Sequence, residues 1–285
     1  MRDKRISRKR LEELDRILAD RDKEILNSLQ KCRYLTTGQI GRLHFKSNAN
    51  KTAALRAANR VLVKLQDYGV IDALERRIGG VRAGSGAYVW FLTETGTKLL
   101  HINDTTYSSR KRFFEPSLNF LEHTLAVSES YVQIAEICDK YHLNLIKVEI
   151  EPVCWRGYIG EDGKPATLKP DLFTVIAGKE YEDSWFIEID LSTESPCIIL
   201  DKCQRYTHYY KSGLEQKQSG VFPLVVWIVP STSRKENLQR NIAECKELHP
   251  KNIFIVITPS EFEELLHQGT EYITAQEKDK GENHG

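Results

Sequence analysis

The sequence lacks the features of a secreted, zinc-binding or membrane-spanning protein. Its 285 residues include six cysteines. None of these form a CxxC pair, so we expect reduced thiols and no zinc site. No apolar run reaches the length of a membrane span, and none follows the basic residues at the N-terminus as it would in a secretory signal. These absences predict a cytoplasmic protein that works away from membranes.

Net charge is also small, at +1, but this total conceals two halves of opposite sign. Residues 1–115 contain 24 Lys and Arg against 13 Asp and Glu, whereas residues 116–285 contain 17 against 27, so the halves carry +11 and −10. A basic half attracts nucleic acid, and an acidic half must have another role. Because the length allows two domains, the split predicts a DNA-binding domain followed by a second domain.

Helices are predicted along much of the basic half. Apolar residues recur at helical spacing over residues 11–31 and again over residues 51–68. Between them, Thr36 and Gln39 have the spacing of a capping box, which begins a short helix that continues to Phe45. Three helices therefore precede the first expected strand.

A β-hairpin is expected after these helices. Strands are predicted at residues 70–77 and 87–93, and the loop between them is rich in glycine. Helices followed by such a hairpin are typical of a winged helix, which we assign to residues 11–104 behind a basic arm at residues 1–10.

The third helix carries the candidate DNA contacts. Its apolar stripe is formed by Leu55, Ala58, Leu62 and Leu65, and basic residues lie on the opposite face. In a winged helix the third helix enters the major groove and the wing touches phosphate. The residues that we expect to contact duplex DNA are Lys51, Arg56, Arg60, Lys64 and, on the wing, Arg82. A basic face can also serve only to solvate a surface helix.

Alternating helices and strands are predicted in the acidic half. The expected elements are a long helix from Pro116, strands at 143–154, 168–177 and 185–191, a helix at 196–210, a strand at 223–229, a helix at 234–248, a strand at 252–258 and a helix at 260–267. This alternation predicts a mixed sheet with helices on its faces, and the whole chain is an α+β protein of two domains. We place a linker at 105–116, the sheet domain at 117–270 and a disordered tail at 271–285.

Acidic residues mark the ends of two neighbouring predicted strands. Asp171 precedes one strand, and Glu188 and Asp190 close the next. A hairpin between the strands would bring Asp171 close to Glu188, and carboxylates gathered at one point suit Mg²⁺ or Mn²⁺. Alternatively, Asp171 could cap a turn, and Glu188 and Asp190 could pair with Lys or Arg at an exposed strand end.

This order of elements and acids resembles the PD-(D/E)xK nuclease superfamily over residues 117–230. The resemblance implies that Asp171 and Glu188 hold a metal and that Lys202, on the following helix, replaces the lysine usually found where this chain has Asp190. It also implies that Glu129 is the acid of the first helix and a third metal ligand. Because Asp190 departs from the pattern, the resemblance supports the architecture more strongly than it supports cleavage.

The chain as a whole resembles the replication-relaxation family of plasmids and mobile elements over about residues 20–230. The motifs that carry this resemblance are Leu92–Gly96, His123–Val127, Lys169–Asp171, Glu188–Asp190, Ser192–Ser195, Lys202 and Arg205–Tyr206. The resemblance implies a DNA-binding protein that acts in replication, relaxation or transfer, with duplex DNA and other replication or relaxosome proteins as partners, possible homodimerisation, and a nuclease-like second domain.

Two other functions remain open at this level. Asp171, Glu188, Asp190 and Lys202 could form an active Mg²⁺- or Mn²⁺-dependent DNA endonuclease, in which the metal activates water. The chain could instead be a transcriptional regulator whose acidic domain only oligomerises, in which case no metal is needed.

Overall fold

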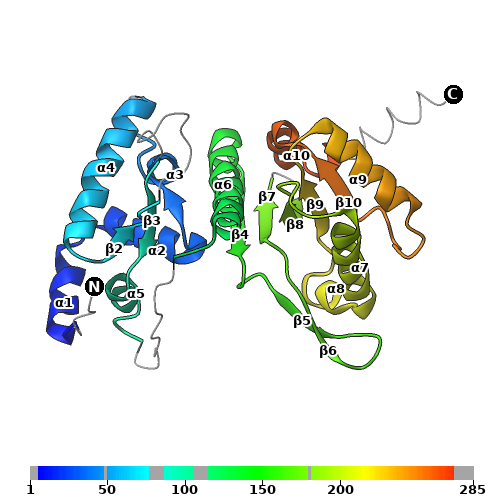
Figure 1. The fold of residues 1–285 in the computed structure, drawn as a ribbon, viewed down its shortest axis with the longest axis horizontal. Coiled ribbons are helices and arrows are strands. Elements are labelled where there is room, and N and C mark those ends of the chain that lie inside the picture. The colour runs from blue at the N-terminus through cyan, green and yellow to red at the C-terminus, as the bar shows by residue number, and fades with distance from the viewer. Residues whose placement is uncertain (1–5, 48–49, 77–86, 105–114, 179–180, 273–285) are drawn as a thin grey trace. The chain divides into compact units, whose positions relative to one another are not determined.

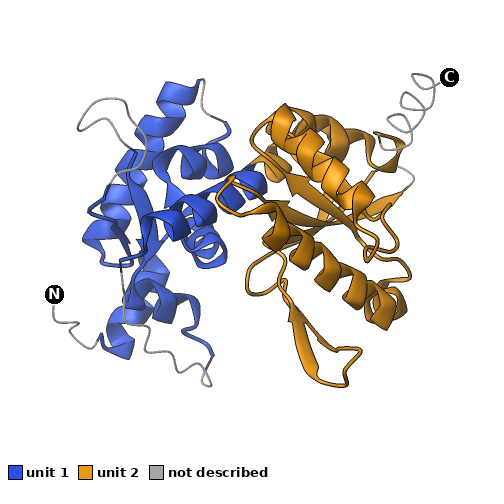
Figure 2. Ribbon diagram, turned by 45° about the vertical axis from the view of Figure 1, so that its right-hand side comes forward, with its two compact units in different colours: residues 1–132 blue, residues 133–285 orange. Residues whose placement is uncertain are grey.

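The computed structural model describes residues 6–47, 50–76, 87–104, 115–178 and 181–272. The chain divides into two compact units, residues 1–132 and residues 133–285, which Figure 2 colours separately. The division falls inside a long helix, α6 (Leu118–Tyr141), and not at the predicted linker. Helices and strands are both present in each unit, so the predicted α+β class is confirmed.

Unit 1 contains short helices and a small antiparallel sheet (Figure 1). Its elements before α6 are α1 (Arg8–Ile17), α2 (Asp20–Cys32), β1 (Leu35–Thr36), α3 (Thr37–His44), α4 (Lys51–Asp67), β2 (Ile71–Ala73), β3 (Val89–Leu92) and α5 (Glu94–Leu100). The strand order is β1-β3-β2. From α3 onward the elements follow the order that the sequence predicts, but the single helix predicted over residues 11–31 is divided into α1 and α2, and the strand β1, which was not predicted, precedes α3. The expected capping box of α3 is present between Thr36 and Gln39.

The boundaries of unit 1 differ from the prediction in two places. Helix α1 begins at Arg8 with Ser7 as its N-cap, so the last residues of the predicted basic arm are helical. The first half of α6 belongs to unit 1 because Leu121 and Leu125 pack with Leu74 and Val89. Most of the predicted linker, residues 105–114, lies outside the described residues.

Unit 2 is built on a mixed five-stranded sheet with strand order β10-β9-β8-β7-β4. The strands are β4 (Asn144–Ile150), β7 (Leu172–Ala177), β8 (Glu182–Ile189), β9 (Leu224–Ile228) and β10 (Phe254–Ile257). Strands β4, β7 and β8 pair antiparallel, and β8, β9 and β10 pair in parallel. Parallel pairs need crossovers, which the helices α7 (Pro196–Ser212) and α9 (Thr232–Glu244) provide.

Three smaller features of unit 2 were not predicted. Strands β5 (Arg156–Ile159) and β6 (Pro165–Leu168) form a separate hairpin, which projects from the unit as a narrow ribbon in Figure 1. A short helix, α8 (Leu214–Ser219), follows α7. The last helix, α10 (Phe262–Gln268), is preceded by a 3-10 turn at Pro259–Glu261. Tyr272 is buried, so the folded part extends past the predicted start of the tail.

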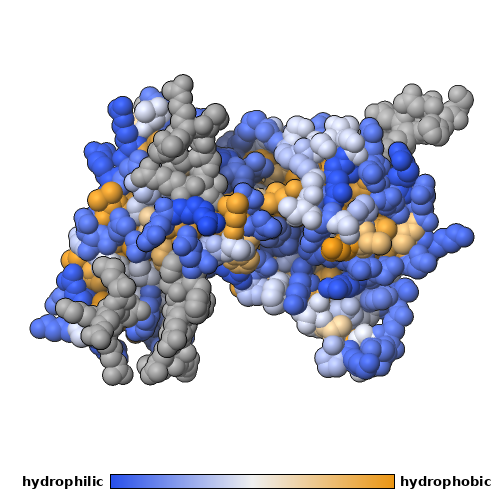
Figure 3. Space-filling model, in the orientation of Figure 1, coloured by the Kyte–Doolittle hydropathy of each residue, from blue (hydrophilic) through white to orange (hydrophobic). Residues whose placement is uncertain are grey.

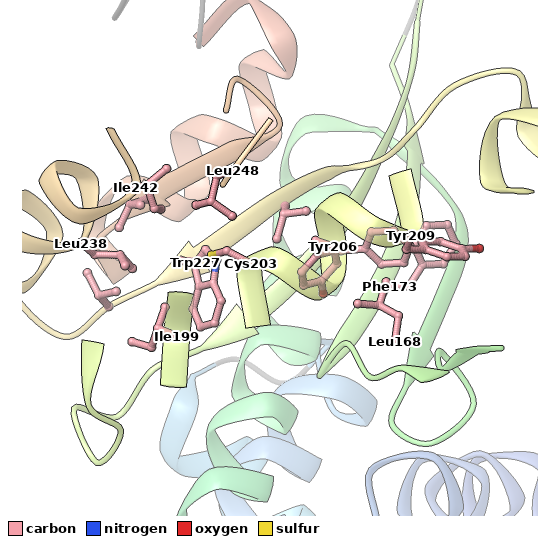
Figure 4. Packing of buried hydrophobic residues seen from close by; sticks show 14 of the residues in the cluster. Leu168, Phe173, Ile199, Cys203, Tyr206, Tyr209, Trp227, Leu238, Ile242 and Leu248 are labelled. Carbon is pink, nitrogen blue, oxygen red and sulfur yellow. The ribbon is translucent and has the colours of Figure 1, made fainter. Parts of the chain in front are cut away.

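The core of unit 2 lies between α7, α9 and the sheet (Figure 4). Helix α7 contributes Ile199, Cys203 and Tyr206, whose spacing places them on one helix face. They pack with Trp227 of β9 and with Leu238 of α9. This packing fixes the rotation of α7, and with it the direction of Lys202.

The surface is mainly hydrophilic on the face shown in Figure 3, where hydrophobic residues form small separate areas. No helix among the described residues is long and apolar enough to cross a membrane.

Candidate functional site

The hairpin of β7 and β8 places Asp171 beside the end of β8. Leu172 pairs with Ile187, so the residue before β7 faces the residues that close β8. The Oδ2 atom of Asp171 accepts a hydrogen bond of 2.8 Å from the backbone nitrogen of Ile189. Asp171 is buried, and so are Glu188 and Asp190, which contradicts the alternative that Glu188 and Asp190 lie at an exposed strand end.

Helix α7 brings two side chains to these carboxylates. The ammonium of Lys202 contacts Oε2 of Glu188 and lies 3.4 Å from Oδ1 of Asp171. The hydroxyl of Tyr206 donates a 2.5 Å hydrogen bond to Oε1 of Glu188. Because Lys202 and Tyr206 are four residues apart on a helix, they project toward the same point. We call Asp171, Glu188, Lys202 and Tyr206 the carboxylate cluster.

Burial and mutual charge control ionisation within the cluster. Burial raises the pKa of Glu188 well above its usual value, and Lys202 opposes that shift. Burial would lower the pKa of Lys202, but the adjacent Glu188 and Asp171 outweigh it, so the pKa is raised. Burial and the neighbouring Glu188 also raise the pKa of Tyr206. Lys202 is therefore a permanently charged cation at neutral pH, and Tyr206 remains a hydrogen-bond donor.

Asp190 does not join the carboxylate cluster, although it was predicted to act with Glu188. Strand β8 ends at Ile189, so the alternation of faces no longer applies one residue later. The Oδ2 atom of Asp190 lies 2.6 Å from Nε of Arg234 on α9, and Oδ1 accepts a hydrogen bond of 2.8 Å from the backbone nitrogen of Ser192. Asp190 thus anchors the chain that leaves β8.

Glu129, the third predicted metal ligand, belongs to unit 1, whereas Asp171 and Glu188 belong to unit 2. Its carboxylate accepts bonds from Arg42 at 2.5 Å and from Gln39 at 3.1 Å, both on α3. In the structure Glu129 therefore joins α6 to α3.

The two carboxylates that do converge are suited in kind to Mg²⁺ or Mn²⁺, and both of them contact Lys202 in the structure. The described residues contain no group of three or more His, Cys, Asp or Glu that could hold a metal ion. Lys202 contacts both Asp171 and Glu188, and Tyr206 contacts the other oxygen of Glu188. As it stands, the cluster is a charge-compensated unit that the chain completes with its own cation, Lys202.

The predicted DNA contacts on α4 have two different surroundings. Lys51, Arg56 and Arg60 are exposed. Lys64 instead lies 2.5 Å from Oδ2 of Asp22, a buried residue that also accepts a hydrogen bond from the backbone of Ala19. The structure therefore assigns Lys64 to the junction of α2 and α4, because a buried carboxylate needs a counter-charge.

The apolar stripe of α4 is shorter than predicted. Ala58, Leu62 and Leu65 are buried, but Leu55 is 42% exposed. Arg82, the predicted wing contact, lies outside the described residues.

Two residues of these networks were missed by the sequence interpretation. Tyr206 enters the sequence interpretation only through the Arg205–Tyr206 motif, although its position four residues after Lys202 indicates a shared target. Arg234 had no comparable local signal, because it lies 44 residues from its partner Asp190 in the sequence.

Comparison with known proteins gives one extensive match. A family model described as "Replication-relaxation" matches residues 26–225, a range that includes α4 and the whole carboxylate cluster. No curated protein matches the chain.

A solved structure of the restriction endonuclease FokI bound to DNA aligns with 88% of this chain at 14% identity. The alignment spans 45% of that chain, and its TM-score is 0.24. A similarity this low supports no conclusion about fold or function.

Proposed function

The chain belongs to the replication-relaxation family, and on that premise we propose that it binds duplex DNA of a plasmid or other mobile element and acts in its replication, relaxation or transfer. In this proposal unit 1 is a winged helix, α4 is its recognition helix, and unit 2 is a nuclease-like module that serves assembly.

The observation that carries the proposal is the pair of arginines on α4. Arg56 and Arg60 are exposed, and neither forms an ion pair or hydrogen bond with any residue that the structure describes. Like charges four residues apart on a helix repel each other by a few tenths of a kcal/mol. A polyanion removes this repulsion, since phosphates placed along the helix neutralise both guanidinium groups.

The proposal is tested by measuring duplex affinity at several salt concentrations. We expect Arg56→Ala/Arg60→Ala to weaken binding and to reduce the slope of log K against log salt by about 2, because each lost phosphate contact changes it by about 1. The matched control is Arg240→Ala/Lys246→Ala, which removes two exposed cations from unit 2. If both double variants bind as the wild type does, α4 is not the DNA-binding helix.

The convergence of Asp171, Glu188 and Lys202 supports a second candidate function, metal-dependent cleavage of DNA. It ranks behind assembly because Lys202 already compensates both carboxylates. The test incubates supercoiled plasmid and Mg²⁺ or Mn²⁺ with the wild type, Asp171→Asn and Glu188→Gln. Nicking by the wild type that both variants lose would establish the endonuclease, whereas equal behaviour of all three proteins would exclude it.

A further inference from the structure

The sheet of unit 2 has two edges, and one of them is open. Strand β10, at one edge, has four residues and none of them is exposed, whereas β4, at the other edge, has seven residues of which three are exposed. Strand β4 pairs with β7 on one side, and no strand that the structure describes pairs with it on the other (Figure 1). An edge of this length presents a row of unpaired backbone groups to which another strand can bind.

The backbone groups of Val148 lie on this open side of β4. The backbone nitrogen of Glu151 donates a hydrogen bond of 3.1 Å to the carbonyl of Asp171, so this pair faces β7. Hydrogen-bonded and non-hydrogen-bonded pairs alternate along an antiparallel ladder, and the register does not shift between Lys147 and Glu151. The backbone groups of Glu149 and Lys147 therefore also face β7, and those of Val148, between them, face away from it.

The charges on β4 allow it to pair with a second copy of itself in one register. If Val148 lies opposite Val148 of the second copy, Lys147 lies opposite Glu149 of that copy, in the non-hydrogen-bonded position where side chains are closest. A shift of two residues in either direction places Lys147 opposite Lys147 or Glu149 opposite Glu149, and like charges directly opposite each other are destabilising. Charge therefore selects the antiparallel register that is centred on Val148.

Two features of β4 that ordinarily discourage pairing are accompanied by one that favours it. A bulge between Leu145 and Lys147, and the lysine itself, oppose the unspecific addition of strands. However, Ile146, at the bulge, is 47% exposed, and an edge that only repels other strands needs no apolar residue there. In the register centred on Val148, Ile146 lies opposite Ile150 of the second copy. The edge is thus protected against most partners and complementary to itself.

We infer that unit 2 forms a homodimer in which β4 pairs antiparallel with β4 of a second copy, so that the two sheets join across a twofold axis at Val148. The inference rests on the proposed function, since it names the partner for the assembly role of unit 2, and a dimer presents two α4 helices to DNA. A single strand pair is a small interface, so the dimer is reversible. A duplex that holds two copies close together strengthens it.

The first test measures self-association of the full chain without DNA, by sedimentation velocity over a range of concentrations. We expect the wild type to shift from monomer to dimer as its concentration rises. Lys147→Glu should weaken the dimer about 10-fold or more, because two attractive pairs become two repulsive ones. Ile146→Asp should also weaken it, because a charge then lies opposite Ile150. The matched control is Ile159→Asp, which changes a residue of the β5–β6 hairpin that is 60% exposed and should leave self-association unchanged.

The second test mixes Lys147→Glu with Glu149→Lys in equal amounts. Neither variant should pair with itself, but each carries the charges that the other lacks, so mixed dimers should form as readily as wild-type dimers. A purely structural role of these residues would not restore association on mixing. Because Glu149 also bonds to Arg156, circular dichroism checks that Glu149→Lys is folded. If it is not, Lys147→Glu and Ile146→Asp decide the inference.

Three results would overturn the inference. The first is a wild type that remains monomeric at every concentration, and the second is a dimer that persists in both Ile146→Asp and Lys147→Glu. The third is the absence of mixed dimers from two folded charge variants, which would refute the register. Duplex affinity is measured separately. A monomer that binds duplex DNA would leave the proposed DNA binding intact, whereas a dimer that binds no duplex would refute the proposed function and leave the pairing of β4 intact.

Discussion

The cations of α4 and the cation of α7 have opposite surroundings. Arg56 and Arg60 are exposed and have no partner among the described residues, whereas Lys202 lies against two buried carboxylates. An exposed, uncompensated charge contributes little to stability and remains available to a ligand. A buried, compensated charge is needed by its partners, because each of them would be costly to leave unpaired. Binding and folding thus depend on different positive charges in this chain.

The largest expected effect comes from removing the buried cation. We expect Lys202→Met to lower the free energy of unfolding of unit 2 by about 3 to 5 kcal/mol, because Glu188 is left buried without a counter-charge. Urea unfolding measures this change. Arg56→Ala/Arg60→Ala should stay within about 0.5 kcal/mol of the wild type.

A second substitution tests whether the lost stability comes from the unpaired charge of Glu188. Glu188→Gln in the Lys202→Met background should recover most of the lost stability, because a neutral amide needs no counter-charge. If Lys202→Met were as stable as the wild type, folding would not depend on the buried cation, and the proposed difference between α4 and the carboxylate cluster would be wrong.

A smaller effect is expected at Tyr206. Tyr206→Phe removes the hydroxyl that donates to Oε1 of Glu188, and hydrogen bonds to charged groups contribute about 1.5 to 3 kcal/mol. The loss should be seen as a lower urea midpoint. Tyr181→Phe is the matched control, because Tyr181 is exposed and its hydroxyl has no partner among the described residues.

Alkaline pH should weaken unit 2 gradually. Burial, followed by the charge of Glu188, raises the pKa of Cys154 and of Cys203 from 9.0 to about 12. Between these values the unfolded chain has released protons that the folded chain retains, so stability falls as pH rises. Each thiol contributes at most about 1.4 kcal/mol per pH unit.

Thermal melting between roughly pH 8 and pH 11 measures this dependence, because in this range the thiols are protonated in the folded chain and lose protons in the unfolded chain. Cys203→Ala should reduce the slope, and Cys197→Ala should not, because Cys197 is exposed. The same slope in all three proteins would show that the buried thiol is not its source.

The smallest expected effect is that of Mg²⁺. Since Lys202 compensates Asp171 and Glu188, we expect Mg²⁺ to leave the melting temperature of the wild type unchanged. A rise in melting temperature that Asp171→Asn abolishes would show that the ion displaces Lys202, and it would favour the endonuclease.

Local sequence signals predicted much of the fold because their causes lie within a few residues. The capping box at Thr36 and Gln39 involves residues three apart, and the stripe of Ala58, Leu62 and Leu65 depends only on helical period. The projecting hairpin of β5 and β6 was missed. It is anchored by Arg156, which bonds to Glu149 at 3.1 Å and lies 4.8 Å from the ring of Phe173. These contacts join separate strands, so no local pattern reports them.

The candidate site was predicted only in part, because only one of its contacts depends on neighbouring segments of the chain. A hairpin between two adjacent strands places Asp171 next to Glu188, and the chain order alone indicates that pairing. The partners of Glu129, Lys64 and Asp190 lie 42 to 90 residues away in the sequence. No local pattern in the sequence indicates these partners, so the predicted roles of the three residues do not include the contacts that they make in the structure.

The sequence by itself determined the α+β class, the order of most of the elements, the charge difference between the halves and the meeting of Asp171 with Glu188, because helical period, strand alternation and hairpin pairing act over short distances. Only the tertiary structure decided which charges are compensated. Lys64 pairs with Asp22, and Arg234 pairs with Asp190. Lys202 completes the carboxylate cluster, whereas Arg56 and Arg60 stay exposed. Compensation depends on which distant elements pack together, since a buried carboxylate is stable only when packing brings a cation to it.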